Sequence, residues 1–303
     1  MDAKAWVFAQ GDNKTYDGTS AATLSFMGTP TAGGVVNLVD PGAGATFSDK
    51  NAAVGKTVTY SGFTLDGGDS GRFSLFGDGS GTTTATITAR ALTVTAASDT
   101  KTYDRTTGSV GMPTHAALQS GDTTTTFAQT FDNRNAGTGK TLTAAGIVND
   151  GNSGNNYAYS FVTDTSGVIN PLAVTLTAPG VTKTYDGGLA YTTLAGDLAA
   201  LTTPLLSGDT VTAATIAYAD RNAGSGNKAV NLNAATISDG NSGNNYAVTL
   251  AGNSTSTITA LGITGSITAA NKVYDATDAA TITGRLLAGV LGTDDVSYSG
   301  GTA

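Results

Sequence analysis

The chain of 303 residues contains no cysteine and no glutamate, so that all 23 acidic residues are aspartate. It has one histidine, one tryptophan and only 13% charged residues. Without cysteine, disulfide bonds and thiolate chemistry are excluded. Glutamate favours helices whereas aspartate favours turns and caps, and 41 residues are glycine, so the composition indicates a chain selected against helix. We therefore expect an all-β fold.

Basic residues are also few, since lysine and arginine total 15 and the formal net charge is −8. Binding to a phosphate backbone needs clustered lysine and arginine, so nucleic acid is not an expected partner. No apolar run approaches the roughly 20 residues that span a bilayer, and membrane insertion is not expected. Small residues, few charges and absent thiols are typical of long secreted surface proteins. We expect an extracellular location on a bacterial cell surface, with any targeting signal outside this chain.

A Lys-x-Tyr-Asp motif, here called the first block, recurs four times along the sequence. Its tyrosines are Tyr16, Tyr103, Tyr185 and Tyr274, spaced by 87, 82 and 89 residues. A second block begins with Asn-Ala and ends in lysine, at residues 51–56, 135–140 and 222–228. A third block, Asp-Gly-Asn-Ser-Gly-Asn-Asn-Tyr, occupies residues 150–157 and 239–246, with a diverged copy at 66–73. The blocks keep one order, which indicates a tandem array.

The spacing predicts three β-sandwich repeats, at residues 1–89, 90–171 and 172–260, and a partial fourth repeat at 261–303. The fourth copy has neither a second nor a third block within this sequence. A unit of about 85 residues lies within the usual size range of a domain. The seam at Asn170-Pro171-Leu172 leaves almost no linker, which restricts bending between units.

Alternation of apolar and polar residues predicts the strands of the second repeat. They are expected at residues 91–96, 123–131, 140–147, 156–162 and 167–170, separated by clusters of glycine, asparagine and aspartate. Short strands with frequent turns favour an antiparallel, immunoglobulin-like β-sandwich, repeated to form an elongated rod. A parallel β-helix is the alternative, but its coils would recur every 20–30 residues or so.

The first block places its lysine and tyrosine on one face of an extended segment, while the aspartate starts a turn closed by Gly18, Gly187 or a small residue. A ligand contact is one interpretation. The preferred interpretation is a scaffold device, in which a buried tyrosine donates its hydroxyl to the backbone as in the tyrosine corner of sandwiches.

Two chemical alternatives attach to the repeated polar residues. A Lys-to-Asn or Lys-to-Asp isopeptide cross-link has Lys101 and Lys140 as candidates, although the acid that commonly catalyses it, glutamate, is absent. The third block is rich in oxygen ligands, as calcium loops are, but it has one carboxylate and no bidentate acid at its end. A hairpin with asparagine and glycine at positive φ is the preferred interpretation.

No residue is predicted to be catalytic, and no cofactor or metal is expected. His115 is the only histidine and has no repeated serine and aspartate partners. The adjacent Asp294 and Asp295 would point to opposite faces of a strand.

Taken together, Lys-Thr-Tyr-Asp-Gly, Asn-Ala-Gly-Thr-Gly-Lys and Gly-Asn-Asn-Tyr, in this order, resemble the YDG and MBG repeats of filamentous-haemagglutinin-type bacterial adhesins of the two-partner-secretion kind. The resemblance covers nearly the whole chain and implies secretion and a stalk or fibre role. The chain departs from the pattern at Arg105 and Ala276, which stand where the motif has glycine.

The expected function is therefore that of a structural stalk or fibre segment of a secreted adhesin, without enzymatic activity. One alternative is a filament subunit joined to copies of itself by strand complementation, because an incomplete fourth repeat would expose strand edges. The other is a module that binds a carbohydrate or matrix glycan through exposed rings such as Trp6, Tyr191 or Tyr218. The expected partners are neighbouring repeats, copies of the chain, or such a glycan.

Overall fold

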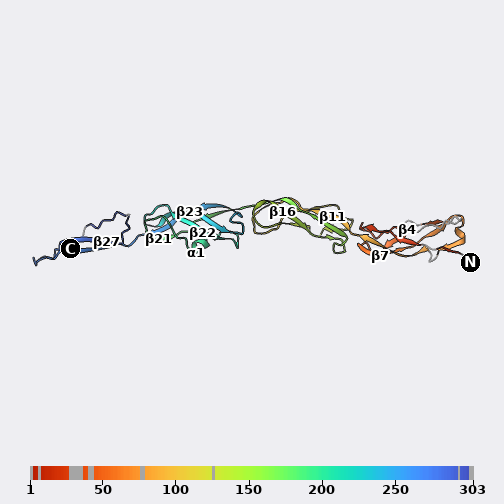
Figure 1. Cartoon of the computed structure of the whole chain (residues 1–303), viewed down its shortest axis with the longest axis horizontal. Helices are drawn as coiled ribbons and strands as arrows, with labels where there is room; N and C mark the ends of the chain where they lie inside the picture. The colour runs from red at the N-terminus through yellow and green to blue at the C-terminus, as the bar shows by residue number, and fades with distance from the viewer. Residues whose placement is uncertain are drawn as a thin grey trace. The chain divides into compact units, whose positions relative to one another are not determined.

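The chain is nearly all β, as its composition predicts. The computed structural model describes residues 3–5, 8–26, 37–39, 44–75, 79–124, 127–292 and 294–299. Figure 1 shows strands along the chain and the helix α1 (Ala195–Thr202) beside β22 (Thr210–Tyr218). A 3-10 turn, η1 (Ser70–Arg72), precedes β9 (Phe73–Leu75). No helix within the described residues is long and apolar enough to cross a membrane.

The helix α1 is not expected from the composition, and its residues explain it locally. Its eight residues include three alanines and two leucines, which are strong helix formers. Asp197 in the first turn accepts the backbone N–H of Leu194 at 2.8 Å, so that it satisfies a donor at the helix start. Leu201 is buried and anchors the helix to the third repeat.

A four-stranded sheet with the same strand order recurs in the first three repeats. The first-block strand lies at one edge, followed by the last strand of the repeat, the second-block strand and the strand before it. These strands are β3 (Lys14–Thr15), β10 (Gly81–Thr88), β7 (Ala53–Tyr60) and β6 (Ala45–Phe47); then β12 (Thr100–Thr102), β19 (Asp164–Asn170), β16 (Gly137–Ala145) and β15 (Ala128–Phe131); then β21 (Thr182–Thr184), β25 (Asn253–Thr259), β23 (Gly224–Ser238) and β22.

A second, smaller sheet joins the start of each repeat to its third block. Its strands are β1 (Ala3–Ala5) with β9 (Phe73–Leu75); β13 (Thr114–His115), β11 (Arg90–Thr95) and β18 (Tyr157–Val162); and β20 (Leu172–Thr177) with β24 (Tyr246–Ala251). Further pairs are β2 (Ala9–Gly11) with β4 (Leu24–Phe26), β5 (Asn37–Val39) with β8 (Thr64–Asp66), β14 (Thr123–Thr124) with β17 (Val148–Asn149), and β26 (Thr264–Ala269) with β27 (Ile282–Ala288).

The expectation of wholly antiparallel sheets is wrong. Strands close in sequence pair antiparallel, as β15 does with β16 and β26 with β27. Strands from the two ends of one repeat pair parallel instead, as β11 does with β18 and β20 with β24. Parallel pairing needs a long connection, and the intervening strands of the repeat supply it. Turn residues in the sequence indicate hairpins, and they therefore predict only the antiparallel pairs.

Each predicted strand of the second repeat has an observed counterpart, with bounds that differ by up to three residues, whereas β12, β13 and β17 are not among the predicted strands. The expected strand over residues 123–131 is two strands, β14 and β15, which belong to different sheets, and residues 125 and 126 between them lie outside the described residues. Buried residues alternate along β11 and β16. Leu92 and Val94 are buried on β11, and Leu142 and Ala144 are buried on β16.

The chain divides into two compact units that do not follow the repeats. One comprises residues 1–100, 107–133 and 138–168, and the other comprises residues 101–106, 134–137 and 169–303. The segment Lys101–Thr106 holds the first block of the second repeat, and Arg134–Gly137 holds the start of its second block. Both blocks therefore group with the third repeat. The first block of the second repeat, and the start of its second block, therefore make their contacts with the repeat that follows.

Candidate functional site at the junctions between repeats

Asp209 is the centre of the junction that joins the first block of the second repeat to the third repeat. The hydroxyl of Tyr103 donates to Asp209 Oδ2 at 2.9 Å, and the hydroxyl of Tyr246 donates to the same oxygen at 2.8 Å. The two rings meet edge to face with centroids 5.5 Å apart. All three residues are buried. The carboxylate of Asp209 therefore accepts one tyrosine hydroxyl from the second repeat and one from the third repeat.

A tight turn presents Asp209 to the two tyrosines. Its backbone N–H donates to the carbonyl of Leu206 at 3.0 Å, while the N–H of Leu206 donates to the hydroxyl of Tyr246 at 3.0 Å. Gly208 holds a φ of 96° in this turn, and a Cβ there would lie 2.1 Å from Arg105 Nη1. Glycine suits the left-handed backbone, and a Cβ at this position would displace the Arg105 guanidinium.

Arg105 supplies the counter-charge to this buried carboxylate. Its Nε lies 3.3 Å from Asp209 Oδ1 as an ion pair, although the two atoms do not meet hydrogen-bond geometry. Arg105 has a φ of 67°, the left-handed conformation that Gly18 and Gly187 hold at the equivalent positions. A non-glycine residue is strained there. The departure from the motif at Arg105 is thus coupled to a buried charge that needs a partner.

The same arrangement occurs where the first block of the first repeat meets the second repeat. Tyr16 donates to Asp122 Oδ2 at 3.0 Å, and Tyr157 donates to it at 2.8 Å. Their ring centroids lie 5.6 Å apart, edge to face. Here the cation is Lys50, with Nζ 3.2 Å from Asp122 Oδ1. The cation comes from a different position, but the two tyrosines and the aspartate are repeated.

The third block forms a loop that is fixed by its own aspartate. Asp150 Oδ1 accepts the N–H groups of Asn152 and Gly154 at 2.7 and 2.9 Å, and Oδ2 accepts that of Asn156 at 2.9 Å. Asp239 makes the same three bonds in the third repeat, at 2.7, 2.9 and 3.0 Å. The carboxylate thereby satisfies backbone donors that a short polar loop would otherwise leave unpaired.

The last asparagine of this loop reaches the second block of the preceding repeat. Asn156 Oδ1 accepts the N–H of Ala52 at 2.7 Å, and Asn245 Oδ1 accepts the N–H of Ala136 at 2.7 Å. Both asparagines are fully buried. The second and third blocks, like the first, therefore meet where one repeat joins the next.

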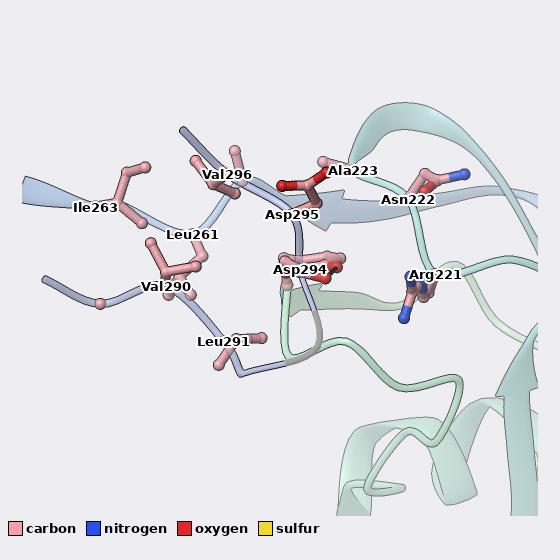
Figure 2. A pocket seen from close by; sticks show the side chains of 13 residues that line it. Arg221, Asn222, Ala223, Leu261, Ile263, Val290, Leu291, Asp294, Asp295 and Val296 are labelled. Atoms are coloured by element: carbon pink, nitrogen blue, oxygen red, sulfur yellow. Dashed lines mark hydrogen bonds between the residues drawn. The ribbon is translucent and has the colours of Figure 1, made fainter. Parts of the chain in front are cut away.

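A third junction is present but less complete. Tyr185 donates to Asp294 Oδ1 at 2.8 Å, which repeats the first half of the arrangement. Within the described residues of the fourth repeat, no second tyrosine reaches this aspartate. A cavity of about 570 Å³ lies here instead. Figure 2 shows Arg221, Asn222 and Ala223 on one side of it, Leu261, Ile263, Val290 and Leu291 on the other, and Asp294 between them.

The first-block lysine organises its own loop, away from the carboxylate at the junction. Lys101 Nζ donates to Asp104 Oδ1 and to the carbonyl of Thr106, each at 2.8 Å, and Asp104 Oδ1 accepts the N–H of Thr106 at 2.8 Å. Burial opposes ionisation of Asp104, but these hydrogen bonds outweigh it and hold the pKa of its carboxyl below the usual range. The predicted aspartate turn is confirmed.

The junctions raise the pKa of their tyrosines. Burial, and next the hydrogen bond to Asp209, raise the pKa of Tyr103, and the same two causes raise that of Tyr246. At the first junction, burial is again the largest cause, and the pKa of Tyr157 is raised to about 12. Ionising these hydroxyls would remove a donor and place a second negative charge beside a buried carboxylate. Each junction therefore requires the neutral phenol.

The tyrosine-corner interpretation is wrong in its partner. Tyr103 is buried as predicted, but its hydroxyl donates to a side chain 106 residues further along, in the next repeat. The sequence predicts no acceptor for the motif tyrosines at Asp122, Asp209 or Asp294, and Asp294 is considered there only beside Asp295 as a catalytic pair. The signal of the three acceptors is a Ser-Gly-Asp sequence, at residues 120–122 and 207–209, with a diverged Gly-Thr-Asp at 292–294. Such a sequence is short and common in turns, so it does not single out these aspartates by itself.

The other candidate residues lie apart from the junctions. His115 is exposed, and its Nδ1 lies 2.8 Å from the carbonyl oxygen of Ala116. Tyr218 is buried and donates to two backbone carbonyls, which contradicts its interpretation as an exposed ring. Tyr191 is half-buried and donates to Asp197. Trp6 lies outside the described residues.

The structure also shows the surroundings of the residues considered for a cross-link and for calcium binding. Lys101 contacts Asp104, and Lys140 contacts Asn133, with Asp132 Oδ1 3.5 Å from its Nζ. The third-block loop is not a hairpin, since β17 and β18 on either side of it belong to different sheets, and positive φ falls on glycine and Ser153 rather than on asparagine. The described residues contain no group of three or more histidine and aspartate side chains suited to a metal ion.

The structure thus defines an all-β chain of tandem repeats whose recurring residues meet at the boundaries between repeats. Comparison with protein families gives this class a name: the YDG domain model matches residues 4–85, 88–166 and 170–260. The chain therefore belongs to the YDG domain family, as its blocks suggested. A search of curated proteins found no match.

Proposed function

We propose that this chain is a structural stalk or fibre segment of a secreted bacterial adhesin, in which the repeats are immunoglobulin-like β-sandwiches set in line. The observation that carries the proposal is that the repeated residues form contacts between neighbouring repeats. Buried Tyr-Asp-Tyr groups and asparagine caps fasten one repeat to the next, at Asp122, Asp209, Asn156 and Asn245. When every repeat makes the same contacts with its neighbour, the chain becomes an extended array, as in solenoid and tandem-repeat proteins.

Other observations support the sandwich fold and the extracellular location in this proposal. Each of the first three repeats has a four-stranded sheet and at least one smaller sheet, and buried residues alternate along strands such as β7 and β16, as a sandwich requires. Membership of the YDG family and a composition without thiols support an extracellular surface location. The filamentous-haemagglutinin context rests on the resemblance of the blocks. We assign the chain no enzymatic activity, and its partners in the proposal are neighbouring repeats.

Small-angle scattering over a concentration series tests the stalk. A compact chain of this length should have a radius of gyration of about 19 Å, whereas a rod of three and a half units, each about 40 Å long, should give about 40 Å. We expect the larger radius, that of the rod, and we expect it to be stable on dilution. The smaller radius, that of the compact chain, would show that the repeats fold back on one another, and the stalk would be rejected.

A filament subunit that pairs with copies of itself is a second candidate. It is supported by the fourth repeat, where β26 pairs with β27 and, within the described residues, with no other strand. Such an edge is a template for strand addition. Growth of the radius of gyration with concentration would favour this function over a single stalk.

A glycan-binding module is a third candidate, supported by rings on the second repeat. Tyr159 and Phe161 are stacked, with centroids 5.9 Å apart, and Phe161 is 40% exposed. Aromatic faces of this kind stack on sugars. Binding on a glycan array that is lost in Phe161→Ala would favour this function.

A further inference from the structure

Within the described residues, the fourth repeat shows no counterpart of one strand that the two preceding repeats have. In those repeats the first strand, β11 or β20, pairs parallel with the strand that follows the third block, over six residues in each case. The equivalent residues of the fourth repeat are 261–266, because Arg90, Leu172 and Leu261 each precede their motif tyrosine by 13 residues, and residues 264–266 of this segment begin β26. Within the described residues, β26 pairs only with β27, on one edge.

The consequence is visible in exposed apolar side chains. Leu92 and Ile263 both lie 11 residues before their motif tyrosine. Leu92 is 3% exposed, whereas Ile263 is 43% exposed and lines the cavity in Figure 2. Ile267, on β26, is 49% exposed.

The same cavity contains the groups that a third block uses elsewhere. Ala52 and Ala136 donate their N–H groups to Asn156 and Asn245, and their counterpart Ala223 lines the cavity. Asp294, the counterpart of Asp209, has one tyrosine where Asp209 has two. Leu261 also lines it, and the N–H of its counterpart Leu172 donates to the carbonyl of Asn245 at 2.9 Å.

The positive charge of Arg221 in the cavity lining also fits a third block, because that block carries an aspartate. A cation precedes the second block in all three complete repeats, as Lys50, Arg134 or Arg221. Arg134 lies against the third-block turn, with Nη2 3.6 Å from the position of a Cβ at Gly240. The third block carries an aspartate beside this glycine. Arg221, which lines the cavity, would face that aspartate in the same way.

We propose that the cavity and the free edge of β26 together form a docking site for one kind of segment, a third block followed by its strand. Its last asparagine accepts the N–H of Ala223, its tyrosine donates to Asp294, and its strand adds in parallel to β26. This inference rests on the proposed function, because it assumes that each junction is completed by the block of a following repeat.

A labelled peptide with the sequence of residues 239–251, added to the whole 303-residue chain, tests the site by fluorescence polarisation. We expect saturable one-to-one binding. Asp294→Ala should raise the Kd at least tenfold, whereas Asp278→Ala, which changes an exposed aspartate outside the cavity, should leave it unchanged. A peptide with alanine at its last asparagine should bind correspondingly weakly.

Amide hydrogen exchange gives a second measure that does not depend on any variant. Bound peptide should slow exchange at Leu261 and along β26. Absence of saturation at millimolar peptide, equal binding of a scrambled peptide, or no added protection of β26 would each overturn the site. A radius of gyration that matches the rod, without peptide binding, would reject the docking site alone. Peptide binding by a chain with the radius of a compact globule would reject the stalk alone.

Discussion

At the scale of single residues, the junctions depend on aspartates that accept two phenols each. A buried carboxylate is strongly unfavourable unless hydrogen bonds and a counter-charge compensate it. Asp209 has two hydroxyl donors and Arg105, and Asp122 has two hydroxyl donors and Lys50. The repeated feature is the pair of phenols, whereas the cation varies in type and in origin. The phenols therefore define the junction, and the cation adjusts its charge.

Asp209→Ala should be strongly destabilising. The substitution leaves two buried hydroxyls without their acceptor and the Arg105 guanidinium without its counter-charge, and removal of one partner of such a group destabilises by about 3–5 kcal/mol. Asp294→Ala is the matched control, because Asp294 accepts a single tyrosine beside an open cavity. It should lose no more than about 1.5 kcal/mol. Urea denaturation followed by circular dichroism measures both, and equal losses would contradict the ranking.

The tyrosines should make the chain sensitive to alkali. A phenol whose folded pKa is raised stabilises the fold fully below the unfolded value, and this stabilisation is lost as pH rises toward the folded value. For Tyr157 the window runs from about pH 10 to about pH 12. The urea midpoint should therefore fall above pH 10, and the phenolate absorbance of the junction tyrosines should appear only as the chain unfolds. Tyr157→Phe should show a smaller fall, and an equal fall would contradict this cause.

At the scale of elements, the blocks and most strands of a repeat follow from the sequence, because alternation and turn residues are local. The strand β11 and the aspartate turn after Tyr103 were predictable in this way. The parallel pairing of β11 with β18 was not, since it joins residues more than 60 positions apart. The acceptor of Tyr103 lies in another repeat, and no local pattern encodes how two repeats meet. The sequence shows that a residue recurs, while its partner requires the structure.

The third-block loop makes one prediction that separates two neighbouring asparagines. Asn156→Ala should destabilise by about 1–3 kcal/mol, because it leaves the N–H of Ala52 without its acceptor in a buried place. Asn155 is exposed and bonds only within its own loop, to the carbonyl of Asn152, so Asn155→Ala should change stability by less than about 0.5 kcal/mol. Thermal unfolding of the two variants checks this, and similar melting temperatures would show that the cap is not stabilising.

At the scale of the whole molecule, repeats that contact only their neighbours behave as a one-dimensional array. The stability of such an array is a sum of repeat terms and junction terms, and strong junctions make neighbouring repeats unfold together. In this chain the tyrosines and carboxylates of the first two junctions are buried, while the first-block lysines and aspartates are ordinary loop-forming pairs. Cooperativity between repeats should therefore respond to the junction aspartates and much less to the loop residues.

Asp122→Ala should separate the unfolding of the first repeat from that of the rest. Asp122 accepts Tyr16 of the first repeat, Tyr157 of the second and the ammonium of Lys50, so its loss removes the coupling at that junction. Amide hydrogen exchange along β7 and β10 reports on the first repeat, whereas circular dichroism reports on all repeats. In the native chain the two urea transitions should coincide. In Asp122→Ala the exchange transition should move to lower urea while the main dichroism transition stays in place. Asp294→Ala, at the other end, should leave the two probes coincident. If the probes already diverge in the native chain, the junction groups do not couple the repeats, and the fastening role assigned to them is wrong.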